Sequence, residues 1–379
     1  MPLVAHIPLP SFDQLRRRGQ EVLSLGHALH QDIRELHIGF LNMMPDAAFR
    51  ITELQFMRLV GSCNQIAQFF VHPFTIRGLP RNAQTQEYIE RFYDSFEKIQ
   101  KDGLDALIIT GANVANPTLE EEAFWKPLQE VITWATVNVT SVLCSCLATH
   151  AIVKHLYNVD RQLLPRKRWG VYSHRVISRE HPLLIDINTR FDVPHSRYNG
   201  ISRAQFEAAG CSVLVDIPGG DVHMAVSFDQ LRIVYLQGHP EYDYNSLLKE
   251  YKREVLRFIS GERPDYPPHP EHYFSEEAAR IVDEFQGRVQ RALEKGKTVP
   301  SFPEKEIEPY LDNTWGDTGK ALFNNWLGLV YQLTNVDRQL PFVPGIDPDD
   351  PLGIRKKWAK EKSNQIEYHE NITDKESHR

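Results

Sequence analysis

Cysteine is scarce in this chain, which has only Cys63, Cys144, Cys146 and Cys211 among 379 residues. No two of them stand at a CxxC spacing, so the sequence predicts neither a disulfide framework nor a metal site, zinc included. Long apolar runs are absent too, and none approaches the ~20 residues that cross a bilayer. The N-terminus lacks the apolar core of a secretory signal. We therefore expect no membrane contact and a cytoplasmic protein.

An excess of positive charge is also missing, and so are phosphate-binding loops. The formal net charge is −7, so no basic excess is available for nucleic acid, and we expect no such partner. Neither GxGxxG nor GxxxxGK[ST] occurs, which removes the usual cradles for nucleotide phosphates. The remaining composition, with 41% hydrophobic and 25% charged residues, is that of an ordinary globular protein with a sizeable core.

Short apolar runs separated by helical patterns predict the fold class. Five of these runs read as buried strands: Leu36 to Leu41, Ala106 to Ile109, Val137 to Leu143, Ser212 to Val215, and Ile233 to Leu236. Buried strands that alternate with helices are typical of an α/β protein with a mostly parallel sheet flanked by helices. That is the fold we expect here.

Helix signals and composition shifts divide the rest of the chain. Thr118-x-x-Glu121 has the form of a capping box that opens a helix towards Trp125. Apolar residues at helical spacing predict further helices from Ser275 to Leu293 and from Gly319 to Leu333. The expected organisation is an N-terminal arm over residues 1–34, one α/β domain over 35–340, and a charged, disordered tail over 341–379.

Cys146 is the first candidate for chemistry. An apolar strand runs into it from Thr140, and a helix-compatible stretch from Leu147 to Tyr157 follows at once. Such a strand-to-helix turn exposes a nucleophile, and the N-terminus of a helix stabilises a thiolate. Cys144 lies one step deeper on the same strand face and reads as core. A buried, purely structural role is also the simpler interpretation of Cys146 itself.

The segment Gly238-His239-Pro-Glu241 supplies a base for that nucleophile. It follows the strand Ile233 to Leu236, and ligand sites collect where parallel strands end. A neighbouring carboxylate would fix the tautomer of the imidazole that takes the proton. Taken alone the segment is just a turn. His150 also lies near Cys146 in the sequence, but it has no acidic neighbour, so His239 is the preferred base.

Motifs in order along the chain resemble the homoserine O-acyltransferase family of the transsuccinylase type. They span roughly residues 31–334 and are Leu41-Asn-Met-Met-Pro45, Thr52-Glu-x-Gln-Phe56, Thr110-Gly-Ala112, Cys146, Gly170-Val-Tyr172, Pro194-His-Ser-Arg-Tyr198, Gly238-His-Pro-Glu-Tyr-Asp243 and Asn325-Trp326-Leu327. The resemblance implies a class I glutamine-amidotransferase-like fold. It also implies a Cys-His-Glu triad of Cys146, His239 and Glu241.

The same resemblance implies the substrates. They would be small molecules, an acyl-CoA donor and a hydroxy-amino acid acceptor, and no bound cofactor. The reaction would be a Cys-linked, ping-pong acylation of L-homoserine in methionine biosynthesis. Ser196, Arg197 and Arg253 match positions that the family uses around substrate. Arginine suits the grip on an amino-acid carboxylate. His174 and His195 read more readily as structural histidines. The oligomeric state stays open, with a homodimer as one option.

Two departures from the family pattern bear on the substrates. Family members related to the well-studied enteric enzyme carry two lysines directly after Met-Pro, but here Met44-Pro45 is followed by Asp46 and no lysine before Arg50. Because a guanidinium is no replacement for an ammonium, L-serine or a related hydroxy-amino acid remains an alternative acceptor. Ala115 stands where the family has Gly with succinyl donors and Glu with acetyl donors. Its small, uncharged side chain favours succinyl over acetyl.

Two other classes of function share parts of this pattern. A glutamine amidotransferase has the same fold and triad, but it normally has glycines around the nucleophile, and here Ser145 and Leu147 flank Cys146. A catalyst that has decayed into a binding module would explain the missing lysines. Slow hydrolysis of acyl-CoA without an acceptor separates these readings, because an acyl-enzyme leaks to water.

Overall fold

The computed structural model describes residues 3–63, 67–217 and 219–361. A nine-stranded sheet runs through the molecule in the order β4-β3-β5-β6-β11-β10-β9-β7-β8. Its first five strands pair in parallel. They are β4 (Gln68–Phe74), β3 (Glu35–Leu41), β5 (Ala106–Ile109), β6 (Ser141–Ser145) and β11 (Ile233–Leu236). The predicted α/β class, with a parallel sheet covered by helices, is confirmed.

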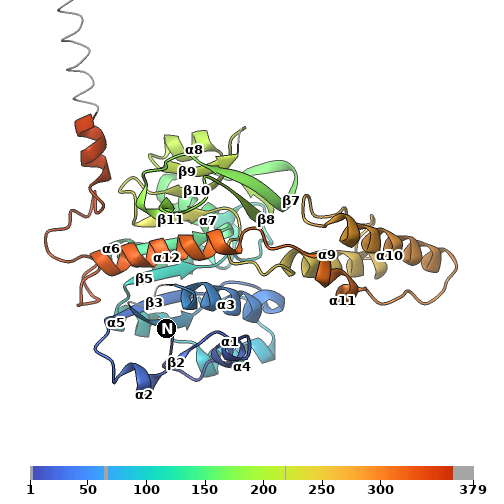
Figure 1. Ribbon diagram of the computed structural model, residues 1–379, viewed down its shortest axis with the longest axis horizontal. Helices are drawn as coiled ribbons and strands as arrows, with labels where there is room; N and C mark the ends of the chain where they lie inside the picture. The colour runs from blue at the N-terminus through green and yellow to red at the C-terminus, as the bar shows by residue number, and fades with distance from the viewer. Residues whose placement is uncertain (1–2, 64–66, 218, 362–379) are drawn as a thin grey trace, which may run out of the picture.

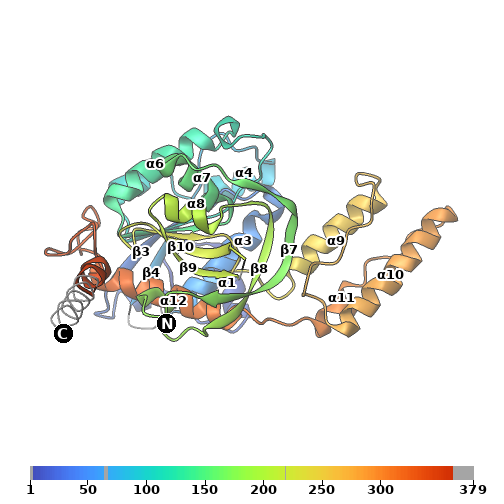
Figure 2. The same ribbon diagram turned by 90° about the horizontal axis from the view of Figure 1, so that it is seen from above.

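The other half of the sheet is antiparallel, a feature that the sequence analysis did not include. Each of its strands pairs antiparallel with its neighbours. They are β10 (Asp221–Val226), β9 (Ser212–Ile217), β7 (Gln162–Val176) and β8 (Arg190–Gly200). β7 and β8 form a long ribbon that curves around one end of the molecule (Figure 2). This ribbon borders the side of the sheet at which the candidate site forms.

Helices cover both faces of the sheet, and the central strands β5, β6 and β11 are accordingly buried along their whole length. The chain packs α1 (Pro10–Arg17), α3 (Asp46–Gly61) and α12 (Gly316–Leu333) into one core with residues such as Ile38 and Leu143. The opposite core contains α5 (Phe96–Asp102), α6 (Trp125–Asn138), α7 (Leu147–Tyr157) and α8 (Arg203–Ala208). Figure 2 shows the two layers on either side of the strands.

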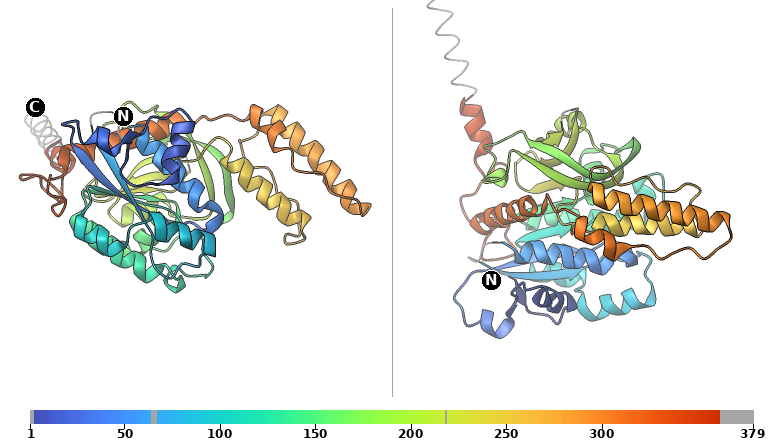
Figure 3. Two further views of the ribbon diagram at one scale, coloured as in Figure 1. Left: turned by 90° about the horizontal axis from the view of Figure 1, so that it is seen from below. Right: turned by 45° about the vertical axis from the view of Figure 1, so that its right-hand side comes forward.

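A helical projection extends away from the sheet. It consists of α9 (Ser246–Ile259), α10 (Glu276–Glu294) and the short α11 (Glu304–Ile307), which lie side by side in each view (Figures 1 and 3). Its own apolar core includes Tyr251 and Phe285 and reaches Trp169 of β7. The first turn of α9 therefore sits against the body, near the end of β11.

The N-terminal segment packs against the body. It contains β1 (Val4–Ala5), α1, β2 (Leu23–Ser24) and α2 (Leu25–Ala28), followed later in the chain by α4 (Ala83–Phe92). Phe12 and Leu15 are buried in the core that α3 and α12 share. No helix within the described ranges has the length and apolar character that crossing a bilayer requires.

The C-terminal segment also makes contacts where it is described. The carbonyl oxygen of Pro341 accepts a hydrogen bond from Thr140, and the amide of Val343 donates to Leu333 at 2.9 Å. Arg355 lies over the ring of Phe228 at 3.5 Å. Residues 362–379 of the expected tail lie outside the described residues. The division into arm, domain and tail stays a prediction.

Two local predictions were wrong. Thr118 makes no capping hydrogen bond, and residues Leu119–Glu121 form only one 3-10 turn before α6 begins at Trp125. The polar groups there hold the preceding loop instead, since Asn116 donates to the carbonyl of Glu121. The run from Val137 to Leu143 also splits, because α6 continues to Asn138 and β6 begins at Ser141.

Candidate active site

Cys146 sits at a sharp turn between β6 and α7. Its backbone has φ 51°, a left-handed value that is rare for a residue with a side chain. The amide of Cys146 donates to the carbonyl oxygen of Leu236 at 2.8 Å, which ties the turn to the end of β11. This conformation holds the side chain above the sheet and leaves it partly exposed. Cys144 is fully buried, and burial raises the pKa of its thiol far above the usual range.

His239 and Glu241 meet directly after β11. Because Leu236 pairs with Ser145 across parallel strands, this turn lies beside the one that bears Cys146. Nδ1 of His239 lies 2.7 Å from Oε1 of Glu241. The imidazole stacks on the ring of Tyr242, with centroids 4.3 Å apart. These contacts fix the ring plane and direct Nε2 towards the thiol.

The electrostatics of His239 favour its charged form. Burial alone would lower the pKa of the imidazole. The Glu241 carboxylate and the Cys146 side chain, which also hydrogen-bonds the ring, outweigh that effect and hold the pKa well above its ordinary value. An imidazolium is therefore favoured beside Cys146, and a cationic imidazole next to a cysteine is typical of an activated nucleophile.

Side chains of α3 and β6 contact Glu241. Arg58 of α3 donates to its carbonyl oxygen at 2.8 Å and forms an ion pair with Asp243. Ser145 Oγ lies 3.4 Å from the carboxylate oxygen that also contacts His239. The turn that carries the base and its orienting carboxylate is thus anchored to both β6 and α3.

Backbone groups face the thiol from α7 and from the loop after β5. Leu147 is the first residue of α7, so its amide N–H has no acceptor within the helix. A methyl carbon placed on Gly111 would lie 3.7 Å from that nitrogen and 3.8 Å from Cβ of Cys146. Gly111 and Leu147 therefore border the place where a carbonyl oxygen of an acyl group would develop negative charge.

A cavity of about 620 Å³ opens over Cys146. Most of its charged lining residues are cations, and Glu254 is the one acid among them in the described part of the chain. The cations are Arg161, Lys167, Arg197, Arg253 and Arg257. A cavity with this charge suits anionic substrates.

Ser196 and Arg253, both predicted from the sequence, line this cavity together with Cys146. Ser196 Oγ donates to Glu250 Oε2 at 2.6 Å, and the phenol of Tyr242 donates to Oε1 of the same carboxylate at 2.7 Å. Nε of Arg253 lies 3.3 Å from Oε1 of Glu254. The Arg253 side chain is 57% exposed, so its guanidinium can still turn towards a ligand.

Arg197 also lines the cavity, but its guanidinium is already bound. It pairs with Asp221, donates to His195 Nδ1 at 3.2 Å and donates to the carbonyl of Asn199 at 2.8 Å. Arg168 pairs with the other oxygen of Asp221. With 2% of its side chain exposed, Arg197 acts as a strut for β8 more readily than as a clamp for a substrate carboxylate.

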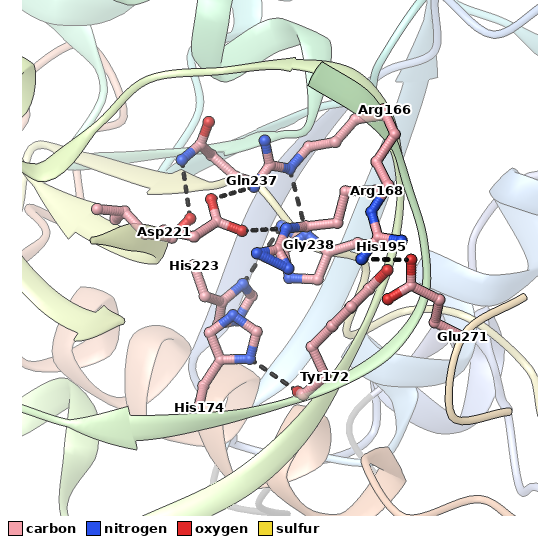
Figure 4. Close-up of polar contacts among 12 residues, drawn as sticks. Arg166, Arg168, Tyr172, His174, His195, Asp221, His223, Gln237, Gly238 and Glu271 are labelled. Carbon is pink, nitrogen blue, oxygen red and sulfur yellow. Dashed lines mark hydrogen bonds and ion pairs between the residues drawn. The ribbon is translucent and has the colours of Figure 1, made fainter. Parts of the chain in front are cut away.

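Three buried histidines lie together on β7, β8 and β10 (Figure 4). The rings of His174 and His195 stack with centroids 5.1 Å apart, and His223 meets both rings edge-on. Burial lowers the pKa of all three, to about 4 for His174. They are neutral packing groups, in keeping with the structural interpretation of His174 and His195.

His150 is buried on α7 and does not compete for the proton of Cys146. Its Nε2 lies 3.0 Å from the side-chain oxygen of Gln237, and burial lowers its pKa to about 3. Gln237 also donates to the carbonyl oxygens of Ile201 and Val222, at 2.9 and 2.8 Å. The sequence analysis did not single out Gln237, which fixes the strand end just before His239.

Ala115 and Arg50 lie outside the cavity lining. Ala115 is exposed, and its amide donates to Glu122 Oε1 at 2.7 Å. Its neighbour Val114 does line the cavity. Arg50 stacks over the ring of Tyr88 at 4.5 Å, so it does not stand in for the missing lysines.

A lysine does reach the cavity, from a place that the sequence analysis missed. Lys167 of β7 lies 3.7 Å from Glu250 and 4.3 Å from the centroid of Trp169. Burial lowers the pKa of its ammonium, against the opposing effect of Glu250 and Glu254. Lys167 stands in a run of basic residues, Arg166 to Arg168. Nothing in the local sequence distinguishes such a run in a cavity from one on an exposed surface.

Comparison with known proteins gives one consistent family. The sequence model of the family described as homoserine O-succinyltransferase matches residues 2–336. The homoserine O-succinyltransferase of Methylococcus capsulatus is 60% identical over 354 residues, which cover 93% of this chain and 100% of that protein. The one of Nitrosococcus oceani is 59% identical, over 94% of this chain and 99% of that protein.

Among solved structures the likeness is distant. A glutamine amidotransferase from Thermotoga maritima covers 78% of this chain and 97% of its own, with 10% identity and a TM-score of 0.38. In residues 3–63, 67–217 and 219–361, no group of three or more His, Cys, Asp or Glu side chains is arranged to hold a metal ion.

Proposed function

From the premise that the chain belongs to the homoserine O-succinyltransferase family, we propose that it moves a succinyl group from succinyl-CoA to the side-chain hydroxyl of L-homoserine through a thioester on Cys146. Acyl transfer to homoserine is a step in methionine biosynthesis. The observation that carries the proposal is the contact of His239 with Glu241 at 2.7 Å beside a cysteine at a strained strand-to-helix turn. The site of action proposed for the reaction is the cytoplasm.

In the first half-reaction the Cys146 thiolate attacks the carbonyl carbon of the thioester donor. The oxygen of the tetrahedral intermediate lies near the Leu147 amide at the start of α7, where the helix dipole favours negative charge. When the carbon–sulfur bond to CoA breaks, the leaving thiolate takes the proton of the His239 imidazolium. The products are free CoA and an acylated Cys146.

In the second half-reaction the homoserine hydroxyl gives its proton to neutral His239 while its oxygen attacks the enzyme thioester. The bond to Cys146 breaks, and the thiolate is restored beside a protonated imidazole. Glu241 stabilises the imidazolium that forms in this step and keeps Nδ1 protonated throughout. Because CoA leaves before the acceptor reacts with the acyl-enzyme, the kinetics should be ping-pong.

The acceptor would bind beside cations that line the cavity. Arg253 can offer its guanidinium to the α-carboxylate of homoserine, and Ser196, fixed by Glu250, can bind a polar group beside it. Lys167 lies in the same wall. Arg197, although predicted as a substrate residue, would support this wall through Asp221.

Other assignments predict different outcomes in one experiment. Specificity constants should be measured with succinyl-CoA and acetyl-CoA, each against L-homoserine and L-serine. The proposal expects succinyl-CoA with homoserine to be the best pair. A preference for serine would establish the alternative acceptor, and glutamine hydrolysis without acyl transfer would establish an amidotransferase. The absence of transfer and of donor hydrolysis with all four pairs would leave a non-catalytic binding protein.

A further inference from the structure

Among the five cations of the active-site cavity, Arg161 differs in what surrounds it. Arg197 pairs with Asp221, and Lys167 lies 3.7 Å from Glu250. Arg253 and Arg257 both lie against Glu254, at 3.3 and 3.4 Å. Arg161 forms no hydrogen bond and no ion pair with any residue in the described part of the chain.

The position of Arg161 places its charge near the nucleophile. It precedes β7 directly, lines the same cavity as Cys146, and is partly buried. Its guanidinium interacts through space with Cys146 and with Glu122, and it also acts on His150 of α7. Burial is the main influence on this guanidinium and lowers its pKa, as expected for a cation that lacks a close partner.

Glu122 acts on Arg161 through space without forming an ion pair with it, and one of its carboxylate oxygens is engaged elsewhere. Its Oε1 accepts hydrogen bonds from the amides of Ala115 and Asn116, at 2.7 and 2.6 Å. The acid therefore holds the loop that follows β5, whose residues Ala112 to Val114 line the cavity. Arg161 therefore lines the cavity beside Cys146 with no hydrogen-bond or ion-pair partner among the described residues, and Glu122 acts on it only through space.

We infer that Arg161 binds the distal carboxylate of the succinyl group and thereby selects a dicarboxylic acyl donor over a neutral one. This inference rests on the proposed function, since it presumes a succinyl thioester at Cys146. The carboxylate stands two methylene groups from the reacting carbonyl, so it must lie in the cavity close to the nucleophile. A planar guanidinium can grip it with two hydrogen bonds, and no existing ion pair has to break.

The other anions of the substrates are served by other groups. The α-carboxylate of the acceptor falls to Arg253 in the proposed function, and Arg257 lies beside it on α9. The phosphates of CoA lie at the other end of the donor, far from the reacting carbonyl. If Arg161 bound a phosphate or the acceptor instead, its loss would affect all donors alike.

The test compares two donors that differ in the distal group alone. Butyryl-CoA has a methyl group where succinyl-CoA has the carboxylate, at nearly the same chain length. For Arg161→Met, kcat/KM with succinyl-CoA should fall about 10- to 100-fold, the range for losing a charge-assisted pair, while kcat/KM with butyryl-CoA should stay the same or rise. Arg161→Lys should retain part of the succinyl preference.

Arg166→Met is the matched control. Arg166 lies on β7, close to Arg161 in the sequence. Its side chain is 81% exposed and pairs with Glu271 at 3.3 Å, so its loss should leave kcat/KM with both donors unchanged. Mass spectrometry of Cys146 after mixing with each donor gives the acylation step directly. An unchanged melting temperature shows that Arg161→Met is folded.

The outcomes separate this inference from the proposed function. Equal losses with both donors, or no loss with either, would overturn the role of Arg161 while leaving acyl transfer at Cys146 intact. Failure of the unaltered protein to acquire any acyl group on Cys146 would overturn the proposed function itself. A selective loss with succinyl-CoA supports the inference.

Discussion

Nδ1 of His239 lies 2.7 Å from Oε1 of Glu241, a residue only two positions further along the chain. The turn at Pro240 brings both side chains to the same side of the strand end. Because this distance is that of a charge-assisted hydrogen bond, the carboxylate determines both the tautomer and the charge of the base.

Glu241→Gln should therefore change both the rate and its pH dependence. Losing the orienting carboxylate should lower kcat by about 10²- to 10⁴-fold. The pKa of His239 is held high by Glu241 together with Cys146, so removing one negative charge lowers it. At alkaline pH, kcat/KM falls because His239 loses the proton of its imidazolium. In Glu241→Gln this fall should begin at a lower pH. A fall that begins at the same pH as in the unaltered protein would contradict this role.

Gly238 has to be glycine because the chain passes close to β8 there. A methyl carbon on Gly238 would lie 2.4 Å from Cγ1 of Val193 and 2.9 Å from Nε2 of His195. Gly238→Ala should displace the adjacent His239 and destabilise the fold by about 1–3 kcal/mol. Urea unfolding and kcat measure the two effects. Gly210→Ala is a useful control: Gly210 has a positive φ, but nothing lies within 4 Å of an added methyl carbon, so stability alone should change.

Asp221 pairs with Arg168 (Figure 4) and also with Arg197, so it compensates the charge of both arginines. Asp221→Asn should lower the free energy of unfolding by about 3 kcal/mol, since it leaves a buried cation without its partner. The KM for homoserine should change little if Arg197 is a strut. A large rise in that KM without a loss of stability would return Arg197 to the list of substrate ligands.

The identity of residue 115 should still affect donor choice. Ala115 is exposed, but its amide is bound to Glu122, and the adjoining Val114 lines the cavity. Ala115→Glu would add a negative charge beside the space for the acyl carboxylate, and use of succinyl-CoA should fall about 10- to 100-fold through like-charge repulsion. Use of acetyl-CoA should change much less. Ala115→Gln, equal in size and uncharged, separates charge from bulk.

In the parallel half of the fold, β3, β5, β6 and β11 could be predicted because they are short, continuous apolar runs, whereas β4, which contains His72 and Pro73, was missed. In the antiparallel half, β9 was predicted as the run from Ser212 to Val215, but β7 and β8 were not, since they carry charged residues and prolines along their length, such as Pro165 and Pro194. Their ladder is specified by pairing with each other, as from Arg168 with Arg197 to Arg175 with Arg190, and such pairing has no signature in a single strand.

Some residues of the candidate site could likewise be predicted from the sequence, and others could not. Cys146, His239 and Glu241 follow recognisable strand ends, so their neighbourhood could be inferred from sequence. Arg161 and Lys167 come from the start of β7, and only the folded ribbon brings them over α7. No local pattern distinguishes them from surface cations, which is why the charge of the cavity could not be anticipated.

The central claim is that the acyl group passes through Cys146, and trapping the thioester tests it most directly. The protein should be mixed with succinyl-CoA in the absence of acceptor, quenched in acid and digested. The account predicts a succinyl adduct on the peptide that carries Cys146, its disappearance when homoserine is added, and its loss in Cys146→Ala but not in Cys144→Ala. An adduct on Cys63 or Cys211 instead, or full transfer activity in Cys146→Ala, would contradict the account.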